Sequence, residues 1–130
     1  RNCFTDFERE MAEIYTMTTG IPLSPEELKQ VGERVVNLKK AFNIREGWTM
    51  ADDWLPPRVL EDPLPSGPGK GVRVTAEELR MLIQDYYAAR GWTPEGLIPK
   101  SKLIALGLED IAEEIGVEEP VAAPMTGGEA

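Results

Sequence analysis

The sequence predicts an all-α fold: a small domain of about five helices, with a long ordered strap rich in proline and glycine between the second and third. Apolar residues recur at helical spacing in five segments, and three of these segments open with a serine or threonine followed three residues later by glutamate. Between them, residues 43–74 (the strap) hold five prolines and no sustained period. We expect residues 1–116 to form the helical domain and residues 117–130, which are acidic and then small, to form a flexible tail.

The first helix is expected to begin at Thr5, because Glu8 has the spacing of a capping box, and to end at Gly20. Its apolar residues fall on one face at helical spacing. They are Phe7, Met11, Ile14 and Tyr15.

The second helix has the clearest start, with Ser24 as N-cap, Pro25 at the first helical position and Glu27 completing a capping box. Lys39 and Lys40 are expected at its negative end. An apolar seam of three-and-four spacing predicts its packing face. The seam consists of Leu28, Val31, Val35, Leu38 and Phe42.

The strap cannot contain a long helix, because its prolines interrupt any helical run. It is also too apolar for a flexible linker, since it carries large side chains including Trp48, Trp54 and Leu64. Two interpretations stay open. The strap is either an ordered segment that lies across another surface or a loop that covers only the core of its own domain.

Three further helices are expected after the strap. Thr75 and Glu78 give another capping box for a helix that ends at Gly91. A short helix then starts at Pro99 and stops at Gly107, and a last one covers residues 109–115.

Composition narrows the function classes. The net charge of −9, from 23 acidic and 14 basic residues, argues against nucleic-acid binding. No apolar run approaches the roughly 18 residues of a membrane span, so no membrane partner is expected. The chain has no histidine, which excludes a Ser-His-Asp or Cys-His catalytic arrangement within it. Its single cysteine cannot form an internal disulfide, so a cytoplasmic location is expected.

Few residues suggest chemistry on their own. Asp52 and Asp53 lie between Trp48 and Trp54, and we expect them to cap a turn or pair with an arginine, because no histidine or second acid cluster completes a metal site. The neighbouring aromatic residues are expected to pack rather than to bind a cofactor. Cys3 stays open, either as a small buried residue or as a ligand that needs partners from elsewhere.

Five stretches together resemble the C-terminal region of the aldehyde:ferredoxin oxidoreductase family, the tungsten or molybdenum bis-pterin enzymes. The stretches are "TG" at 19–20, "GERVVNLKKAFNIREG" at 32–47, "DDWLPPR" at 52–58, "GPGKG" at 67–71 and "YYAARGWTPEGLIPKSKLIALGL" at 86–108. The resemblance implies a larger polypeptide whose upstream domains enclose a tungsten (or molybdenum) bis-pterin and a 4Fe-4S cluster. It maps the fourth cluster ligand onto Cys3 and places Phe4 next to the pterin.

What the resemblance implies about function is aldehyde oxidation to carboxylic acids, with electrons passing through the cluster to ferredoxin or another acceptor. No catalytic residue is assigned to this chain, and the isolated chain is expected to be inactive and to hold no cofactor. A catalytic subunit of a related aryl-CoA ring reductase is one alternative, and a non-catalytic helical interaction module is another. If the chain is part of such an enzyme, its first helix and strap should leave an apolar surface for a missing domain to cover.

Overall fold

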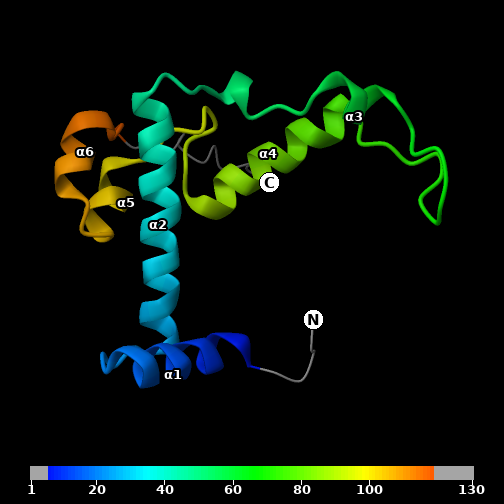
Figure 1. Ribbon diagram of the computed structural model, residues 1–130. Coiled ribbons are helices and arrows are strands. Elements are labelled where there is room, and N and C mark those ends of the chain that lie inside the picture. Colours follow the sequence, from blue (N-terminus) through cyan, green and yellow to red (C-terminus); the bar gives the residue numbers. More distant parts are fainter. Residues whose placement is uncertain (1–5, 119–130) are drawn as a thin grey trace, which may run out of the picture.

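The computed structural model describes residues 6–118, whose regular structure is helical (Figure 1). In chain order the elements are α1 (Phe7–Thr19), α2 (Pro25–Arg45), the 3-10 helix η1 (Met50–Asp52), α3 (Pro57–Glu61), α4 (Ala76–Arg90), α5 (Lys100–Ala105) and α6 (Glu109–Ile115). The all-α prediction is confirmed. All five expected helices are present, and the strap adds the two short ones, η1 and α3.

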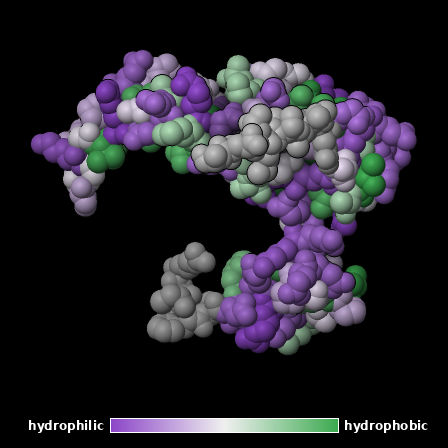
Figure 2. All heavy atoms as spheres, turned by 180° about the vertical axis from the view of Figure 1, so that it is seen from behind, coloured by the Kyte–Doolittle hydropathy of each residue, from purple (hydrophilic) through white to green (hydrophobic). Residues whose placement is uncertain are grey.

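The long helix α2 is the central element, and the other helices are arranged around it (Figure 1). α1 crosses one end of it, whereas α4 and the strap extend from the other end, and α5 and α6 pack beside that same end. In Figure 2 the α1 region is joined to the larger body only by a narrow neck, and the outline between them is deeply hollowed. The chain therefore has the shape of a bracket.

Local capping signals located most helix ends correctly. At α2 the backbone N–H of Glu27 donates to Ser24 Oγ (3.1 Å) and the N–H of Ser24 donates to Glu27 Oε2 (2.8 Å). The same reciprocal pair joins Thr75 and Glu78 at α4. Gly91 ends α4 with a φ of 64°, in the left-handed region that favours glycine.

Two predicted helix ends were wrong. Asp6, not Thr5, caps α1, because its carboxylate accepts the backbone N–H of Arg9 (3.3 Å); Thr5 lies outside the described residues. α2 continues past its predicted end to Arg45, since no helix-breaking residue occurs before Gly47 (φ 90°). Lys39 and Lys40 consequently lie within the body of the helix.

The strap is ordered by backbone hydrogen bonds, as expected. Its tip is a tight loop in which the N–H of Leu64 donates to Val72 O (3.0 Å) and the N–H of Gly71 donates to Leu64 O (2.9 Å). Pro57 occupies the first turn of α3, where a missing N–H costs no hydrogen bond.

The core is small and lies where α2, α5 and α6 meet. It is formed by the buried residues Ala41, Ile98, Leu103 and Ala112, with Ile44, Trp92, Leu108, Ile111 and Ile115 packed around them. The chain after α6 remains attached, because the N–H of Val117 donates to Ile98 O (3.1 Å) and Val117 O accepts from the N–H of Lys100 (2.9 Å). The boundary at residue 116 stays a prediction, and residues 119–130 lie outside the description.

The predicted packing face of α2 is not buried in this chain. Val35 and Phe42 are 51% and 55% exposed, whereas the buried residues Asn37, Lys40 and Ala41 lie on the opposite face. The apolar residues of α1 and the strap are also exposed, which confirms the expected apolar surface. They include Phe7, Met11, Ile14, Tyr15, Trp48, Met50, Trp54, Leu55, Val59, Leu64 and Val72.

Candidate functional site

The two residues that the sequence singled out as cofactor contacts, Cys3 and Phe4, lie outside the described residues. Among residues 6–118, no three histidine, cysteine or acidic side chains lie close enough together to hold a metal ion. Asp52 and Asp53 therefore form no metal site with other residues of this part of the chain.

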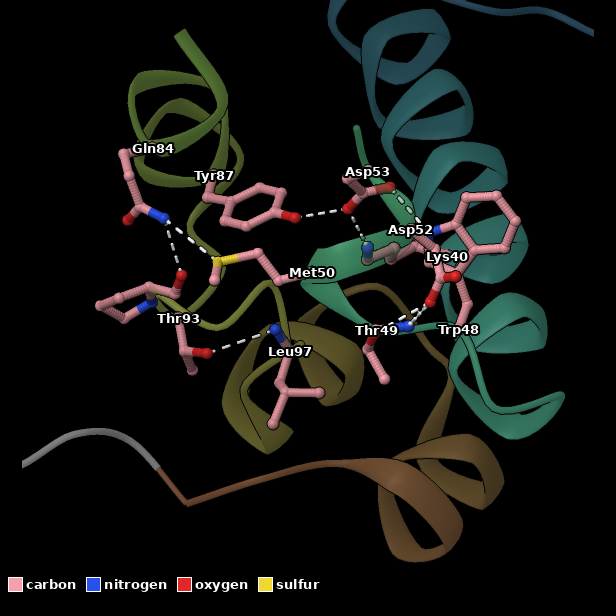
Figure 3. A network of polar contacts seen from close by, with 11 residues as sticks. Lys40, Trp48, Thr49, Met50, Asp52, Asp53, Gln84, Tyr87, Thr93 and Leu97 are labelled. Carbon is pink, nitrogen blue, oxygen red and sulfur yellow. Dashed lines mark hydrogen bonds and ion pairs between the residues drawn. The ribbon is translucent and has the colours of Figure 1, made fainter. Parts of the chain in front are cut away.

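Asp53 is the centre of a polar network that joins three elements (Figure 3). Its Oδ2 accepts a hydrogen bond from Lys40 Nζ of α2 (2.8 Å) and a short one from the hydroxyl of Tyr87 of α4. Its Oδ1 accepts the indole N–H of Trp48 (2.8 Å) from the strap itself. Of the two expected roles, pairing with an arginine is wrong for Asp53: its charged partner is Lys40, which lies on the buried side of α2.

Lys40 sits in an aromatic cage. Its side chain is only 8% exposed, and its Nζ lies 5.4 Å from the ring centroid of Tyr87 and 5.3 Å from that of Trp92. A cation over aromatic faces is attracted by the ring quadrupoles, and the attraction grows as water is excluded. The ammonium is therefore held by one carboxylate and two rings.

Protonation in this network is fixed at neutral pH. Burial raises the pKa of Asp53, but the hydrogen bonds from Lys40, Tyr87 and Trp48, with the charge of Lys40, outweigh burial and bring the pKa below its ordinary value. Burial and the hydrogen bond to the Asp53 carboxylate raise the pKa of Tyr87. Asp53 is thus an anion and Tyr87 a neutral phenol, so the group serves as a latch rather than an acid or base.

Asp52 has a separate, local role. Its Oδ2 accepts the backbone N–H of Thr49 (2.8 Å) and the hydroxyl of Thr49 (2.9 Å), which caps the turn of η1. These two hydrogen bonds lower the pKa of Asp52. The expected turn-capping role is confirmed for Asp52, while Asp53 carries the ion pair.

A second polar chain runs through the buried side of α2. The amide of Asn37, fully buried, accepts the indole N–H of Trp92 (2.8 Å) and donates to Glu33 O (2.9 Å). The carboxylate of Glu33 in turn pairs with Arg90 (2.5 Å) and Lys102 (3.4 Å). Sequence periodicity missed Asn37 and Lys40, because polar residues on a helix are expected to face water; the only available signal was their place in the "GERVVNLKKAFNIREG" stretch.

A hollow of about 540 Å³ opens between α2 and α4 next to this network. This volume falls within the usual range of ligand pockets, and the lining is mostly apolar and aromatic. Within the lining, the rings of Tyr86 and Trp92 meet edge to face with their centroids 5.6 Å apart, so Tyr86 packs against another aromatic ring, as expected. The hollow is lined by Val36, Lys39, Lys40, Asn43, Asp53, Leu82, Ile83, Tyr86, Tyr87 and Trp92.

The family model of aldehyde ferredoxin oxidoreductase, domains 2 and 3, matches residues 4–108. The chain therefore belongs to the aldehyde ferredoxin oxidoreductase family. It is 42% identical over 92 residues to the tungsten-containing aldehyde ferredoxin oxidoreductase of Pyrococcus abyssi, which covers 70% of this chain and 15% of the relative. It is 40% identical over 101 residues to the enzyme of the same name from Thermococcus kodakarensis, covering 77% of this chain and 15% of the relative.

Two further similarities widen the comparison. The chain is 34% identical over 107 residues to the WOR-like subunit of aliphatic sulfonate oxidoreductase from Pyrococcus furiosus, covering 78% of this chain and 16% of the relative. Among solved structures, the active site complex BamBC of benzoyl coenzyme A reductase with 1,5-dienoyl-CoA matches with a TM-score of 0.66 and 27% identity, over 82% of this chain and 15% of that one. The chain thus spans about 15% of the length of the relatives it matches. Within residues 6–118, every helix is too short or too polar to cross a membrane.

Proposed function

We propose that this chain is the C-terminal helical part of a tungsten-dependent oxidoreductase that oxidises aldehydes to carboxylic acids. The observation that carries the proposal is its similarity to tungsten-containing aldehyde ferredoxin oxidoreductases over most of its length. In the overall reaction an aldehyde and water give a carboxylic acid, two protons and two electrons. The electrons would pass through a 4Fe-4S cluster to ferredoxin or another acceptor, in the cytoplasm.

The cofactors would be held mainly by upstream domains of the same polypeptide. Residues 6–118 offer no set of metal ligands, so they do not fit a cluster or a metal by themselves and no chemical step is assigned to them. Cys3 would supply one thiolate of the four that a 4Fe-4S cluster takes, and Phe4 would lie beside the pterin. The tungsten pterin, or its molybdenum counterpart, supplies the redox chemistry, and the protein supplies orientation and insulation.

The described residues would act by holding one wall of the enzyme rigid. The Asp53 carboxylate fixes the strap to α2 and α4 at once through Lys40 and Tyr87. A fixed strap keeps its exposed apolar side chains in register for the domain that would cover them.

A second candidate is the catalytic subunit of an aryl-CoA ring reductase. The likeness to the benzoyl coenzyme A reductase complex supports this reading at the level of both fold and sequence. The same helices would serve either reaction, because substrate choice would be made by residues upstream of this chain.

The test uses the polypeptide that contains this chain, purified without oxygen. We expect it to contain tungsten or molybdenum and to reduce ferredoxin when an aldehyde is added. Reduction of benzoyl-CoA in place of aldehyde oxidation would favour the second candidate. A protein with metal that performs neither reaction would refute both.

Cys3 is tested by its own substitution. Cys3→Ser should lower the iron content and weaken the electron paramagnetic resonance signal of the reduced cluster, because one of its four ligands is lost. Asn2→Ser, one residue away, is the matched control and should change neither readout. Unchanged iron and an unchanged signal in Cys3→Ser would show that Cys3 is not a ligand.

A further inference from the structure

The apolar seam on the outer face of α2 presents an unusual arrangement for a single domain. Leu28, Val31, Val35, Leu38 and Phe42 follow the alternating three-and-four spacing of a helix that packs against another helix. Yet Leu28 is only half-buried and the other four are 40–55% exposed. α2 buries its opposite face instead. At the C-terminal end of the seam, Leu38 and Phe42 line a hollow together with Ile111 and Ile115 of α6, but Val31 and Val35, nearer the middle of the helix, remain 40% and 51% exposed.

Gly32 lies beside this seam and points to a close neighbour. It sits in the interior of α2, where glycine is a poor helix former, and its φ is not in the left-handed region that would call for glycine. A Cβ built on Gly32 would meet no atom within 4 Å, so nothing in the described chain explains why the side chain is missing. A glycine at such a position lets a second backbone approach the helix closely.

The edge of the seam that holds Gly32 also carries a positive charge. Lys39 lies two helical turns further along, on the same edge, and is exposed; within residues 6–118 it forms no ion pair. It forms part of the lining of the hollow between α2 and α4, together with Val36 and Tyr86. A surface on which another helix could pack therefore continues from the seam into this hollow.

We infer that the α2 seam is the docking site for one amphipathic helix supplied by the remaining polypeptide, packed closely over Gly32, with an acidic residue facing Lys39. The occupant is assigned to the same polypeptide because the chain spans about 15% of the length of its relatives, which leaves most of such a protein outside it. The bracket outline in Figure 2 leaves the neck formed by α2 open to that helix. The inference rests on the proposed function only in placing the chain within a longer protein.

The first test measures whether the seam is covered. Val35→Cys and Gln30→Cys are made in the polypeptide that contains this chain, and each is labelled with a maleimide and located by peptide mass spectrometry. Val35 lies on the seam, whereas Gln30 is exposed and lies five residues away, on a different face of the same helix. We expect Val35→Cys to react at least ten times more slowly than Gln30→Cys. Equal rates would overturn the inference.

The second test uses the sign of a stability change. An exposed helical glycine is stabilised by alanine, so helix propensity alone predicts that Gly32→Ala raises the Tm. Close packing of a partner helix predicts the reverse, a fall of about 2 °C or more, and a larger fall for Gly32→Leu. Gln30→Leu places the same leucine side chain on another face of the helix and should leave the Tm almost unchanged. A rise in Tm for Gly32→Ala would overturn the inference.

Two other outcomes separate the causes of failure. Protection of Val35→Cys that appears only as the concentration of this chain rises, together with sedimentation as a dimer, would assign the seam to a second copy and overturn the inference. An active enzyme with a freely labelled Val35→Cys would refute the docking site but leave the proposed function standing. Protection in a protein with neither proposed activity would support the docking site and refute the function.

Discussion

Removing the Asp53 carboxylate should be the most damaging single change in the strap. In Asp53→Ala, Lys40 loses the carboxylate that pairs with it although its side chain is only 8% exposed, and the donors of Tyr87 and Trp48 lose their acceptor. Breaking a buried ion pair costs about 3–5 kcal/mol, because a charge is left without compensation. Since the side chain of Asp53 is itself 27% exposed, water can replace part of the loss, and we expect a cost of about 2–4 kcal/mol.

Denaturant unfolding followed by tryptophan fluorescence measures this cost, because the indole of Trp48 is bonded to Asp53. Asp52→Ala is the matched control. The exposed carboxylate of Asp52 caps only a local turn, so its loss should lower the free energy of unfolding much less. Adding Lys40→Met to Asp53→Ala should restore part of the stability, since the unpaired ammonium is then gone. The latch would be disproved if Asp53→Ala and Asp52→Ala unfolded at the same denaturant concentration.

The same carboxylate predicts a pH dependence. Because the folded-state pKa of Asp53 is lowered, its stabilisation is present above the unfolded pKa of about 3.9 and is lost as pH falls through the folded value. The stability difference between the wild type and Asp53→Ala should therefore shrink below about pH 4. The contribution of Tyr87 to stability depends on pH in the opposite direction. Because its folded-state pKa is raised, the stabilisation is present below about pH 10 and is lost as pH rises further. Denaturation midpoints across pH measure both limits.

Two further substitutions test the packing around the network. Gly96→Ala should lower the free energy of unfolding by about 2–4 kcal/mol, because Gly96 has a φ of 78° and a Cβ there would lie 2.7 Å from the Tyr87 ring. The control is Gly107→Ala, where φ is 68° but a Cβ would meet open space, and it should cost only about 1 kcal/mol. Equal costs for the two variants would contradict the contact with Tyr87. Trp92→Phe should cost about 1–3 kcal/mol in thermal unfolding, because the fully buried Asn37 loses its indole donor; a neutral result would mean that water replaces it.

Helix boundaries were largely readable from the sequence because capping is a local interaction. A serine and a glutamate three residues apart satisfy each other's backbone, and a glycine ends a helix by its own φ, whatever lies across the fold. The capping boxes at Ser24 and Thr75 and the stop at Gly91 follow from this. The start of α1 failed for the same local reason, because Asp6 is also a good cap and competed with Thr5.

The polar networks could not be read in the same way. Asp53 lies 13 residues from Lys40 and 34 from Tyr87, and their meeting depends on how the strap returns across α2 and α4. Trp92 and Asn37, 55 residues apart, meet for a similar reason. Spacing along one helix holds no information about such pairs.

The sequence by itself determined the all-α class, most of the helix ends and the family of the chain, since caps, breakers and family motifs are properties of short stretches. Only the tertiary structure decided which face of α2 is buried. The apolar seam at Val35 and Phe42 has the pattern of a core face but is exposed, while Asn37 and Lys40 are buried on the other side. Periodicity reveals that a face is suited to burial, but burial itself requires a partner across it, and the described residues do not bury this face.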